Sequence, residues 1–436
     1  MEVVVASSSV EAGIACWDLN TGAELLRYKS CASPPHGLVC VGERFLASSQ
    51  LRDSTGSVKY WAWSKPQPDA KSSQDEPIKP LSANTEGSYI VGGGLSGAIY
   101  LWEVASGRLL KKWDAHYRAV SCLVFSDDNS LLYSGSEDGE VRVWNVISIF
   151  DDHQSQQEKH LYLHSFTEHS LCVTDIVAGF GCNAIIVSAS EDRTCKIWSL
   201  SRGELLRNIV FPTIIDAIAM DPGEHVLFAG GRDGNIYVAA LNTASPSSSK
   251  YGLHILTRFS NHSKAVTCLA YGISGNYLIS GSEDGVVRVW DAKTLNIVRV
   301  LKHAKGPVNN ILVVRQQVSV ASSRRHGSSL PPPLDKRAYE ADKDADFKAV
   351  IGLQDTCSNS TDALYITSHV MERQIRELQQ QGSASAEMEI ERLKLDNKRC
   401  IQMVQQWKKM YENLHQFCVN EIVDGDKRGA PNGNPA

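Results

Sequence analysis

Three sets of histidine, serine, aspartate and tryptophan recur in the sequence at nearly constant spacing. Histidine precedes aspartate by 22, 23 and 22 residues, and aspartate precedes tryptophan by six residues each time. The sets are His116, Ser136, Asp138 and Trp144; His169, Ser190, Asp192 and Trp198; and His262, Ser282, Asp284 and Trp290. Serine, histidine and aspartate are the residues of a hydrolytic triad, in which histidine activates a serine nucleophile.

A triad is one constellation in one cleft, whereas this set occurs three times. It also contains an indole N–H donor, for which hydrolysis has no use. A hydrogen-bonded chain of these side chains would instead satisfy polar groups that cost about 1–3 kcal/mol each when buried without a partner. We therefore predict that the three sets are structural, that the chain is not an enzyme and that it needs no cofactor.

Other sequence patterns could in principle bind a nucleotide or a metal, but they lack the structural context that such sites require. Gly92, Gly94 and Gly97 fit GxGxxG, but that fingerprint must open a helix, and here a strand-like segment follows. His153, His160 and His164 fall in or beside one insertion, where a solvated loop is expected rather than a metal site. The 11 cysteines contain no CxxC pair, which argues against zinc and against a disulfide framework.

The three sets belong to a longer internal repeat. Residues 134–144 read SGSEDGEVRVW, residues 188–198 read SASEDRTCKIW and residues 280–290 read SGSEDGVVRVW. Fainter copies bring the number to seven, with Ala239 in one tryptophan position. The copies end at positions 17, 61, 102, 144, 198, 239 and 290.

Each copy has short apolar runs, an Asp-Gly type turn and then alternating residues, which is typical of a β-hairpin. A period of 40–45 residues with four strands per unit predicts an all-β, seven-bladed WD40 β-propeller. The chain starts in the middle of a blade, so we expect residues 308–314 to complete the first blade by pairing with residues 2–7. Residues 64–80, 148–163 and 242–251 are expected to be surface loops.

Beyond the repeat, the composition changes and predicts four regions. These are a propeller over 1–315, a polar linker over 316–383 with room for a short helix, a coiled-coil helix over 384–423 and a disordered tail over 424–436. Alternating steps of three and four residues give the long helix an apolar seam. The seam consists of Ile390, Leu393, Asn397, Cys400, Val404, Trp407, Tyr411, Leu414 and Cys418. It implies a partner helix, from a second copy or another protein, or else the flank of the propeller.

The net charge and the hydropathy limit the partners and cellular locations that we expect for the chain. The formal net charge is −5, so no overall positive field favours nucleic acid. The apolar runs are far shorter than the roughly 20 residues that cross a bilayer, and the N-terminus lacks a secretory signal. We therefore expect a protein of the cytosol or nucleus, with no membrane partner.

The degenerate sixth tryptophan position, the polar linker and the helical extension together resemble the WD-repeat protein 18 family. That family includes the fungal Ipi-three subunit of the Rix-one complex and plant root initiation defective protein three. The strongest strings, SGSEDGEVRVWN and SGSEDGVVRVWD, are shared by WD40 proteins at large. The resemblance therefore rests on the start within a blade, the insertions and the helical tail.

The resemblance implies a non-catalytic scaffold of the nucleus, nucleolus and nucleoplasm that acts in maturation of the large (60S) ribosomal subunit and in pre-rRNA spacer processing. Implied partners are a helical-repeat Rix-one or PELP-type scaffold, an Ipi-one or testis-expressed-ten-type protein, a midasin-type AAA ATPase and the pre-60S particle. It also implies a homodimer through the C-terminal helix. An alternative is a WD40 substrate receptor of a cullin-type ubiquitin ligase, since Trp290 to Lys293 loosely match the WDxR adaptor motif.

Overall fold

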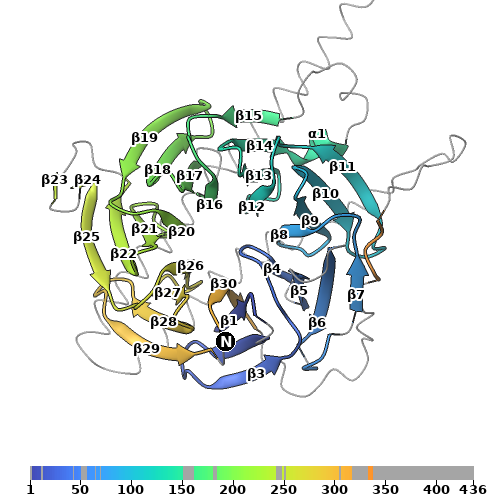
Figure 1. The fold of residues 1–436 in the computed structure, drawn as a ribbon, viewed down its shortest axis with the longest axis horizontal. Helices are drawn as coiled ribbons and strands as arrows, with labels where there is room; N and C mark the ends of the chain where they lie inside the picture. The colour runs from blue at the N-terminus through green and yellow to red at the C-terminus, as the bar shows by residue number, and fades with distance from the viewer. Residues whose placement is uncertain are drawn as a thin grey trace, which may run out of the picture. The chain divides into compact units, whose positions relative to one another are not determined.

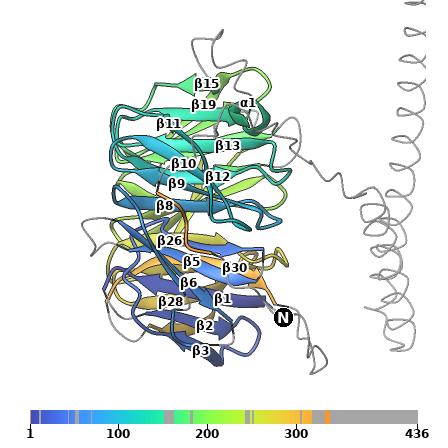
Figure 2. The ribbon, with the colours of Figure 1, turned by 90° about the vertical axis from the view of Figure 1, so that its right-hand side faces the viewer.

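Seven four-stranded antiparallel sheets, called blades 1 to 7 in chain order, follow one another around a ring in the computed structural model (Figures 1 and 2). The structure describes residues 2–316, except 11–12, 43, 51–55, 64, 69, 151–161, 180–183, 242–247, 250–251 and 304–305, together with residues 332–336. This arrangement confirms the predicted seven-bladed propeller. The predicted linker helix, coiled-coil helix and tail lie outside the described residues.

Every blade runs from an inner strand beside the ring axis to an outer strand at the rim (Figure 1). From inner to outer, blade 1 contains β30 (Val308–Arg315), β1 (Glu2–Ser8), β2 (Ile14–Asp18) and β3 (Glu24–Tyr28); blade 2 contains β4 (Leu38–Val41), β5 (Phe45–Gln50), β6 (Ser57–Ala62) and β7 (Ala70–Ser73). Blade 3 contains β8 (Ile78–Ala83), β9 (Tyr89–Gly94), β10 (Ala98–Glu103) and β11 (Leu109–Asp114); blade 4 contains β12 (Val120–Phe125), β13 (Leu131–Ser136), β14 (Val141–Asn145) and β15 (Tyr162–Phe166).

The remaining blades follow the same plan. Blade 5 contains β16 (Val173–Ala178), β17 (Ile185–Ser190), β18 (Thr194–Ser199) and β19 (Glu204–Val210); blade 6 contains β20 (Ile215–Met220), β21 (Val226–Gly231), β22 (Asn235–Ala240) and β25 (Ile255–Ser260); blade 7 contains β26 (Val266–Tyr271), β27 (Tyr277–Ser282), β28 (Val286–Asp291) and β29 (Ile297–Lys302). A short helix, α1 (Val146–Phe150), follows β14, and a two-stranded ribbon, β23 (Ser248–Ser249) and β24 (Gly252–Leu253), precedes β25.

Blade 1 is closed by strands from the two ends of the ring. β1 pairs antiparallel with β30, with Glu2 opposite Arg315 and Val5 opposite Leu312. This pairing confirms the prediction that residues 308–314 complete the first blade by pairing with residues 2–7. Because the last strand completes the first sheet, the ring has no open end at which a blade face would meet water.

Apolar side chains fill the spaces between blades. Seven buried clusters each combine residues of two adjacent blades, one cluster for each of the seven interfaces. The largest fully buried side chains are tryptophans of the repeat: Trp61, Trp102, Trp144, Trp198 and Trp290. Each blade therefore depends on both neighbours to bury its faces, as expected for a repeat protein.

The tight turns of the repeat require glycine where the sequence places it. Gly139 has φ 85° and Gly285 has φ 77°, both in the left-handed region. A Cβ on Gly139 would lie 2.7 Å from the carbonyl oxygen of His169 in the next blade. The Asp-Gly pairs thus allow a compact turn and also a close approach between blades.

The expected surface loops are partly regular structure. Residues 64–80 contain the outer strand β7 and the start of β8, and residues 148–163 contain the end of α1 and the start of β15. His164 accordingly lies in β15, where its ring stacks on Phe166 with centroids 5.9 Å apart. The prediction failed at β7 because Ala, Lys and Ser lack strand propensity, so pairing with β6 alone creates this strand.

The predicted polar linker also contains an ordered piece. Residues 332–336 lie against the rim of blades 2 and 3, seen as the orange segment beside β7 in Figure 1. Leu334 is buried there among residues of both blades. Among the described residues, no helix has the length and apolar character needed to span a bilayer.

Candidate functional site

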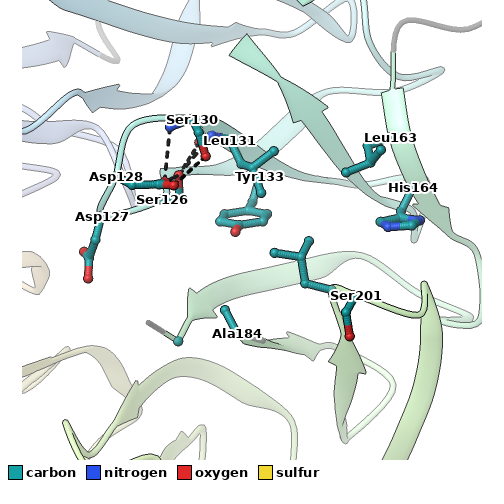
Figure 3. Close-up of a pocket in the computed structure, with 12 residues that line it drawn as sticks. Ser126, Asp127, Asp128, Ser130, Leu131, Tyr133, Leu163, His164, Ala184 and Ser201 are labelled. Atoms are coloured by element: carbon teal, nitrogen blue, oxygen red, sulfur yellow. Dashed lines mark hydrogen bonds between the residues drawn. The ribbon is translucent and has the colours of Figure 1, made fainter. Parts of the chain in front are cut away.

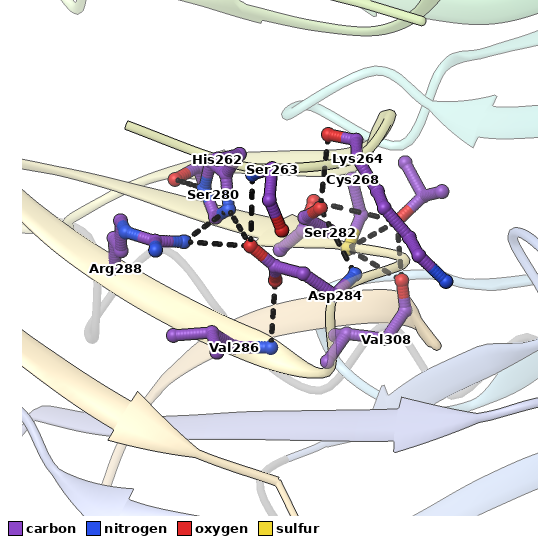
Figure 4. Close-up of polar contacts among 12 residues, drawn as sticks. His262, Ser263, Lys264, Cys268, Ser280, Ser282, Asp284, Val286, Arg288 and Val308 are labelled. Carbon is purple, nitrogen blue, oxygen red and sulfur yellow. Dashed lines mark hydrogen bonds and ion pairs between the residues drawn. The ribbon is translucent and has the colours of Figure 1, made fainter. Parts of the chain in front are cut away.

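In blade 7, His262, Ser280, Asp284 and Trp290 form one hydrogen-bonded chain, of which Figure 4 shows His262, Ser280 and Asp284. His262 Nε2 lies 2.8 Å from Ser280 Oγ, and the indole Nε1 of Trp290 donates to the same hydroxyl at 2.8 Å. On the other side of the ring, His262 Nδ1 lies 3.1 Å from a carboxylate oxygen of Asp284. Arg288 also donates to Asp284 at 3.1 Å. The chain links the loop before the blade to two strands and their turn.

Blades 4 and 5 repeat this geometry. In blade 5, His169 lies 2.8 Å from Ser188 Oγ and 2.9 Å from Asp192, and Trp198 donates to Ser188 at 2.9 Å. The corresponding distances in blade 4 are 2.7 Å for His116 to Ser134, 3.3 Å for His116 to Asp138 and 2.8 Å for Trp144 to Ser134. The indole N–H therefore has the same hydroxyl partner in all three blades.

The serines predicted for these chains were wrong by two residues. The bridging hydroxyls belong to Ser134, Ser188 and Ser280 rather than to Ser136, Ser190 and Ser282. In blade 4, Trp144 is opposite Leu132 in the sheet, and the indole reaches that strand's diagonal neighbour two residues on, which is Ser134. Ser136 instead donates to the carbonyl of Ala119 at 3.0 Å and accepts the N–H of Asp138 at 3.2 Å, which holds the turn.

The electrostatics of the chains favour a charged aspartate. Burial opposes ionisation of Asp138, but bonds from His116 and from the N–H of Glu140 outweigh it and lower the pKa of the carboxyl to about 2. The pKa values of Asp192 and Asp284 are lowered by the equivalent histidine bonds, again against the effect of burial. A permanent negative charge at each turn thereby orients the histidine ring.

These chains are unsuited to nucleophilic catalysis. Ser134, Ser188 and Ser280 have no exposed surface, so a substrate carbonyl cannot reach their hydroxyls. His116, Asp138 and Glu140 also lie close enough to hold a metal, with their ligand atoms within 4.8 Å of one another. However, Glu140 pairs with Arg142 at 2.6 Å, and the oxygens of Asp138 accept backbone N–H bonds. The hydrogen-bonded chains therefore have a structural role, which is to hold the strands, turn and preceding loop of each blade together.

Sequence reasoning missed a second set of polar contacts, which joins neighbouring blades. Asp175 of β16 is buried, and its carboxylate accepts the N–H of Ile176 and, in the next blade, of Ile218, each at 2.8 Å. Burial raises the pKa of Asp175, against the attraction of His36, whose Nε2 lies 3.9 Å away. His36 itself bonds the carbonyl of Thr174 at 3.0 Å, which connects blade 2 to blade 5. The sequence signal for this contact is an aspartate within a short strand segment that also contains Val173, Ile176 and Val177.

A surface pocket opens between blades 4 and 5 (Figure 3). It has a volume of about 600 Å³, with Tyr133, Leu163 and Leu200 among its lining residues. The polar residues at one side bond each other, since Ser126 and Ser130 both donate to Asp128, at 2.5 and 2.7 Å. The pocket therefore combines apolar side chains with a polar cluster whose members are hydrogen-bonded to one another.

The predicted oligomerisation residues, from Ile390 to Cys418, lie outside the described residues, as do His153 and His160. The fold and its polar chains define the class of protein, a WD40-type β-propeller. In agreement, the family profile described as "WD domain, G-beta repeat" matches residues 107–145, 161–199 and 253–291.

Relatives that match over most of their length identify the family within this class. The chain is 54% identical over 435 residues to root initiation defective 3 of Arabidopsis thaliana, covering 97% of this chain and 98% of that protein. It is 34% identical to human WD repeat-containing protein 18, over 78% and 79% of the two chains. Pre-rRNA-processing protein IPI3 of Yarrowia lipolytica is 29% identical, over 70% and 73%. The chain belongs to this WD-repeat protein 18 and IPI3 family.

Proposed function

We propose that this chain is a non-catalytic scaffold subunit in maturation of the large ribosomal subunit and in processing of the pre-rRNA spacer. The observation that carries the proposal is similarity over most of the chain to proteins that include a pre-rRNA-processing protein. A protein with this role would act in the nucleus, chiefly in the nucleolus and nucleoplasm, where the large-subunit RNA precursors are processed.

The structure supports a scaffold in two ways. The recurring His, Ser, Asp and Trp chains are hydrogen-bonded within the blades and their bridging serines are buried, so these residues stabilise the ring. The ring itself offers top, bottom and rim surfaces to different partners at once. Several large proteins can therefore be held in a fixed relation without any one site having to recognise them all.

The partners that follow from this proposal are the subunits of a Rix-one-type complex. They are a helical-repeat scaffold of the Rix-one or PELP type, a protein of the Ipi-one or testis-expressed-ten type and a midasin-type AAA ATPase on the pre-60S particle. The helix predicted over residues 384–423 would join two copies of the chain. Linking two rings raises the effective concentration of every ring surface for a two-fold target.

Affinity purification of the tagged full-length chain tests this function. The proposal predicts that pre-60S assembly factors and precursors of the large-subunit RNA elute with the protein. A matched control is another seven-bladed WD40 protein purified from the same cells. Recovery of cullin adaptors without RNA precursors would contradict the proposal and favour a ubiquitin-ligase receptor.

A further inference from the structure

A short segment after the ring, residues 332–336, occupies a groove at the rim between blades 2 and 3. Its leucine, Leu334, is only 4% exposed and joins the apolar cluster of these two blades. The cluster includes Val58 of blade 2 and Leu109 of blade 3. A buried leucine in a polar, proline-containing segment indicates a specific contact rather than a chance one.

The ring binds every polar backbone atom of the dipeptide Leu334–Asp335. Ser72 Oγ accepts the N–H of Leu334 at 2.7 Å, and the carbonyl of Gly107 accepts the N–H of Asp335 at 2.7 Å. In return, Gln74 Nε2 donates to the Leu334 carbonyl at 3.5 Å, and Trp102 Nε1 donates to the Asp335 carbonyl at 2.9 Å. Four backbone bonds and one side-chain pocket are the usual elements of peptide recognition.

The sequence of blade 3 explains why this groove exists. Trp102 is opposite Ile90, so its diagonal neighbour two residues on is Gly92, which cannot offer the hydroxyl that Ser134 offers to Trp144. Ser96 occupies the repeat position of Asp138, and Gln74 lies 22 residues before it, which is the position of His116 in blade 4. Because the hydrogen-bonded chain of blade 3 lacks a serine at the position of Ser134, the indole N–H of Trp102 does not have the acceptor that blades 4, 5 and 7 provide. The carbonyl of Asp335 supplies one.

A glycine of the ring makes room for the segment. Gly107, in the turn between β10 and β11, has φ 72°, and a Cβ added there would lie 2.4 Å from the carbonyl oxygen of Pro333. The equivalent turn of blade 7 carries Leu295 at φ 57°, with the same backbone bond to the residue four positions earlier. The turn itself therefore tolerates a side chain, whereas the groove does not.

We propose that this groove, formed by Ser72, Gln74, Trp102 and Gly107, is a docking site for a peptide segment that buries a leucine. Its resident ligand is the chain's own segment 332–336, bound in cis. The 16 residues between β30 and Pro332 can span roughly 50 Å when extended, which allows the segment to reach the rim of its own ring. Docking fixes the point from which the C-terminal extension leaves the propeller.

Two full-length variants test whether the segment occupies the groove. Gly107→Asn keeps the left-handed backbone, which asparagine tolerates, but places a side chain against Pro333. We expect at least tenfold faster amide exchange at Leu334 and Asp335 and a shifted indole N–H resonance for Trp102. Gly22→Asn is the matched control, because it changes the equivalent turn of blade 1 and should leave these signals unchanged. Unchanged signals in Gly107→Asn would overturn the proposal.

A peptide added in trans tests whether the groove is a docking site. In full-length Leu334→Asp, the resident segment should leave, and a synthetic peptide of residues 329–338 should restore the Trp102 resonance. The same peptide with aspartate in place of its leucine should not. Failure of the unmodified peptide to bind would contradict a separable docking site.

Backbone recognition and docking in cis each predict a further result. In Asp335→Ala, the amides of residues 334 and 335 should keep their protection from hydrogen exchange, because the ring bonds to the backbone of this exposed residue. Loss of protection in Asp335→Ala would contradict backbone recognition. Protection in the wild-type chain should also be independent of protein concentration. Loss on dilution would show that the occupant comes from a second copy, which would contradict docking in cis.

Discussion

At the scale of single residues, the hydroxyl that joins histidine to tryptophan decides how each complete blade is held together. Ser134 and Ser136 are both buried and both hydrogen-bonded, but only Ser134 contacts the indole of Trp144. The sequence predicted the type of residue and missed the position. The miss arose because the repeated string contains two serines, and only the register between two strands separates them.

Substitution of the two serines distinguishes their roles. Ser134→Ala leaves the Trp144 N–H and the Nε2 atom of His116 without their partner, so we expect a loss of about 1–3 kcal/mol in the free energy of unfolding. The indole N–H resonance of Trp144 should shift. Ser136→Ala is the control: it also loses turn bonds, but the Trp144 resonance should stay in place. A Trp144 shift in Ser136→Ala alone would contradict the assignment.

The lowered pKa of Asp138 predicts a defined acid sensitivity. The folded value of about 2 lies below the ordinary value of 3.8, so ionised Asp138 stabilises the fold above about pH 4. That stabilisation is lost as the pH falls from about 4 to about 2. Between these limits the wild type should lose about 1–2 kcal/mol relative to Asp138→Asn, measured by urea unfolding at each pH. Parallel pH profiles for the two proteins would rule the effect out.

At the scale of strands, ring closure depends on a contact that no repeat copy shares. Asn310 of β30 donates to Ser7 Oγ at 3.0 Å, to Ser33 Oγ at 3.2 Å and to the carbonyl of Pro34 at 2.7 Å. The amide thus joins both ends of blade 1 to the loop that leads into blade 2. The pairing of β30 with β1 was predictable because the missing strand reappears after the seventh copy.

Asn310→Ala should weaken closure. The two serine hydroxyls and the Pro34 carbonyl lose the bonds from this amide, so we expect about 1–3 kcal/mol less free energy of unfolding and faster amide exchange in β1 and β30. The neighbouring Asn309 lies at the bulge between Val308 and Asn310 and is less buried than Asn310, so Asn309→Ala should have the smaller effect. Equal losses in the two variants would show that Asn310 has no special part in closure.

The elements that escaped sequence analysis share a physical reason. β7 has little strand propensity, and residues 332–336 lack the hydrophobic periodicity that marks a regular element. Both are ordered by contacts outside the segment itself: β7 by pairing with the preceding strand β6, and the 332–336 segment by Ser72, Gly107 and Trp102, which are distant in the sequence. A repeat predicts what is common to its copies. The groove arises where blade 3 departs from them.

At the scale of the whole molecule, the extension is expected to join two rings. Removal of residues 384–436 deletes the predicted seam and should leave a folded, monomeric propeller, because all seven interfaces between blades lie within the ring. Light scattering of both proteins at the same concentration measures this. A dimer mass that persists after the truncation would show that another surface joins the copies.

Depletion of the protein from cells, followed by analysis of ribosomal RNA precursors, tests the central claim most directly. A scaffold for large-subunit maturation predicts that precursors retaining the spacer between the 5.8S and 25S sequences accumulate, while small-subunit precursors stay at control levels. Re-expression of the full-length chain should reverse the accumulation. An unchanged precursor profile after complete depletion would contradict the account.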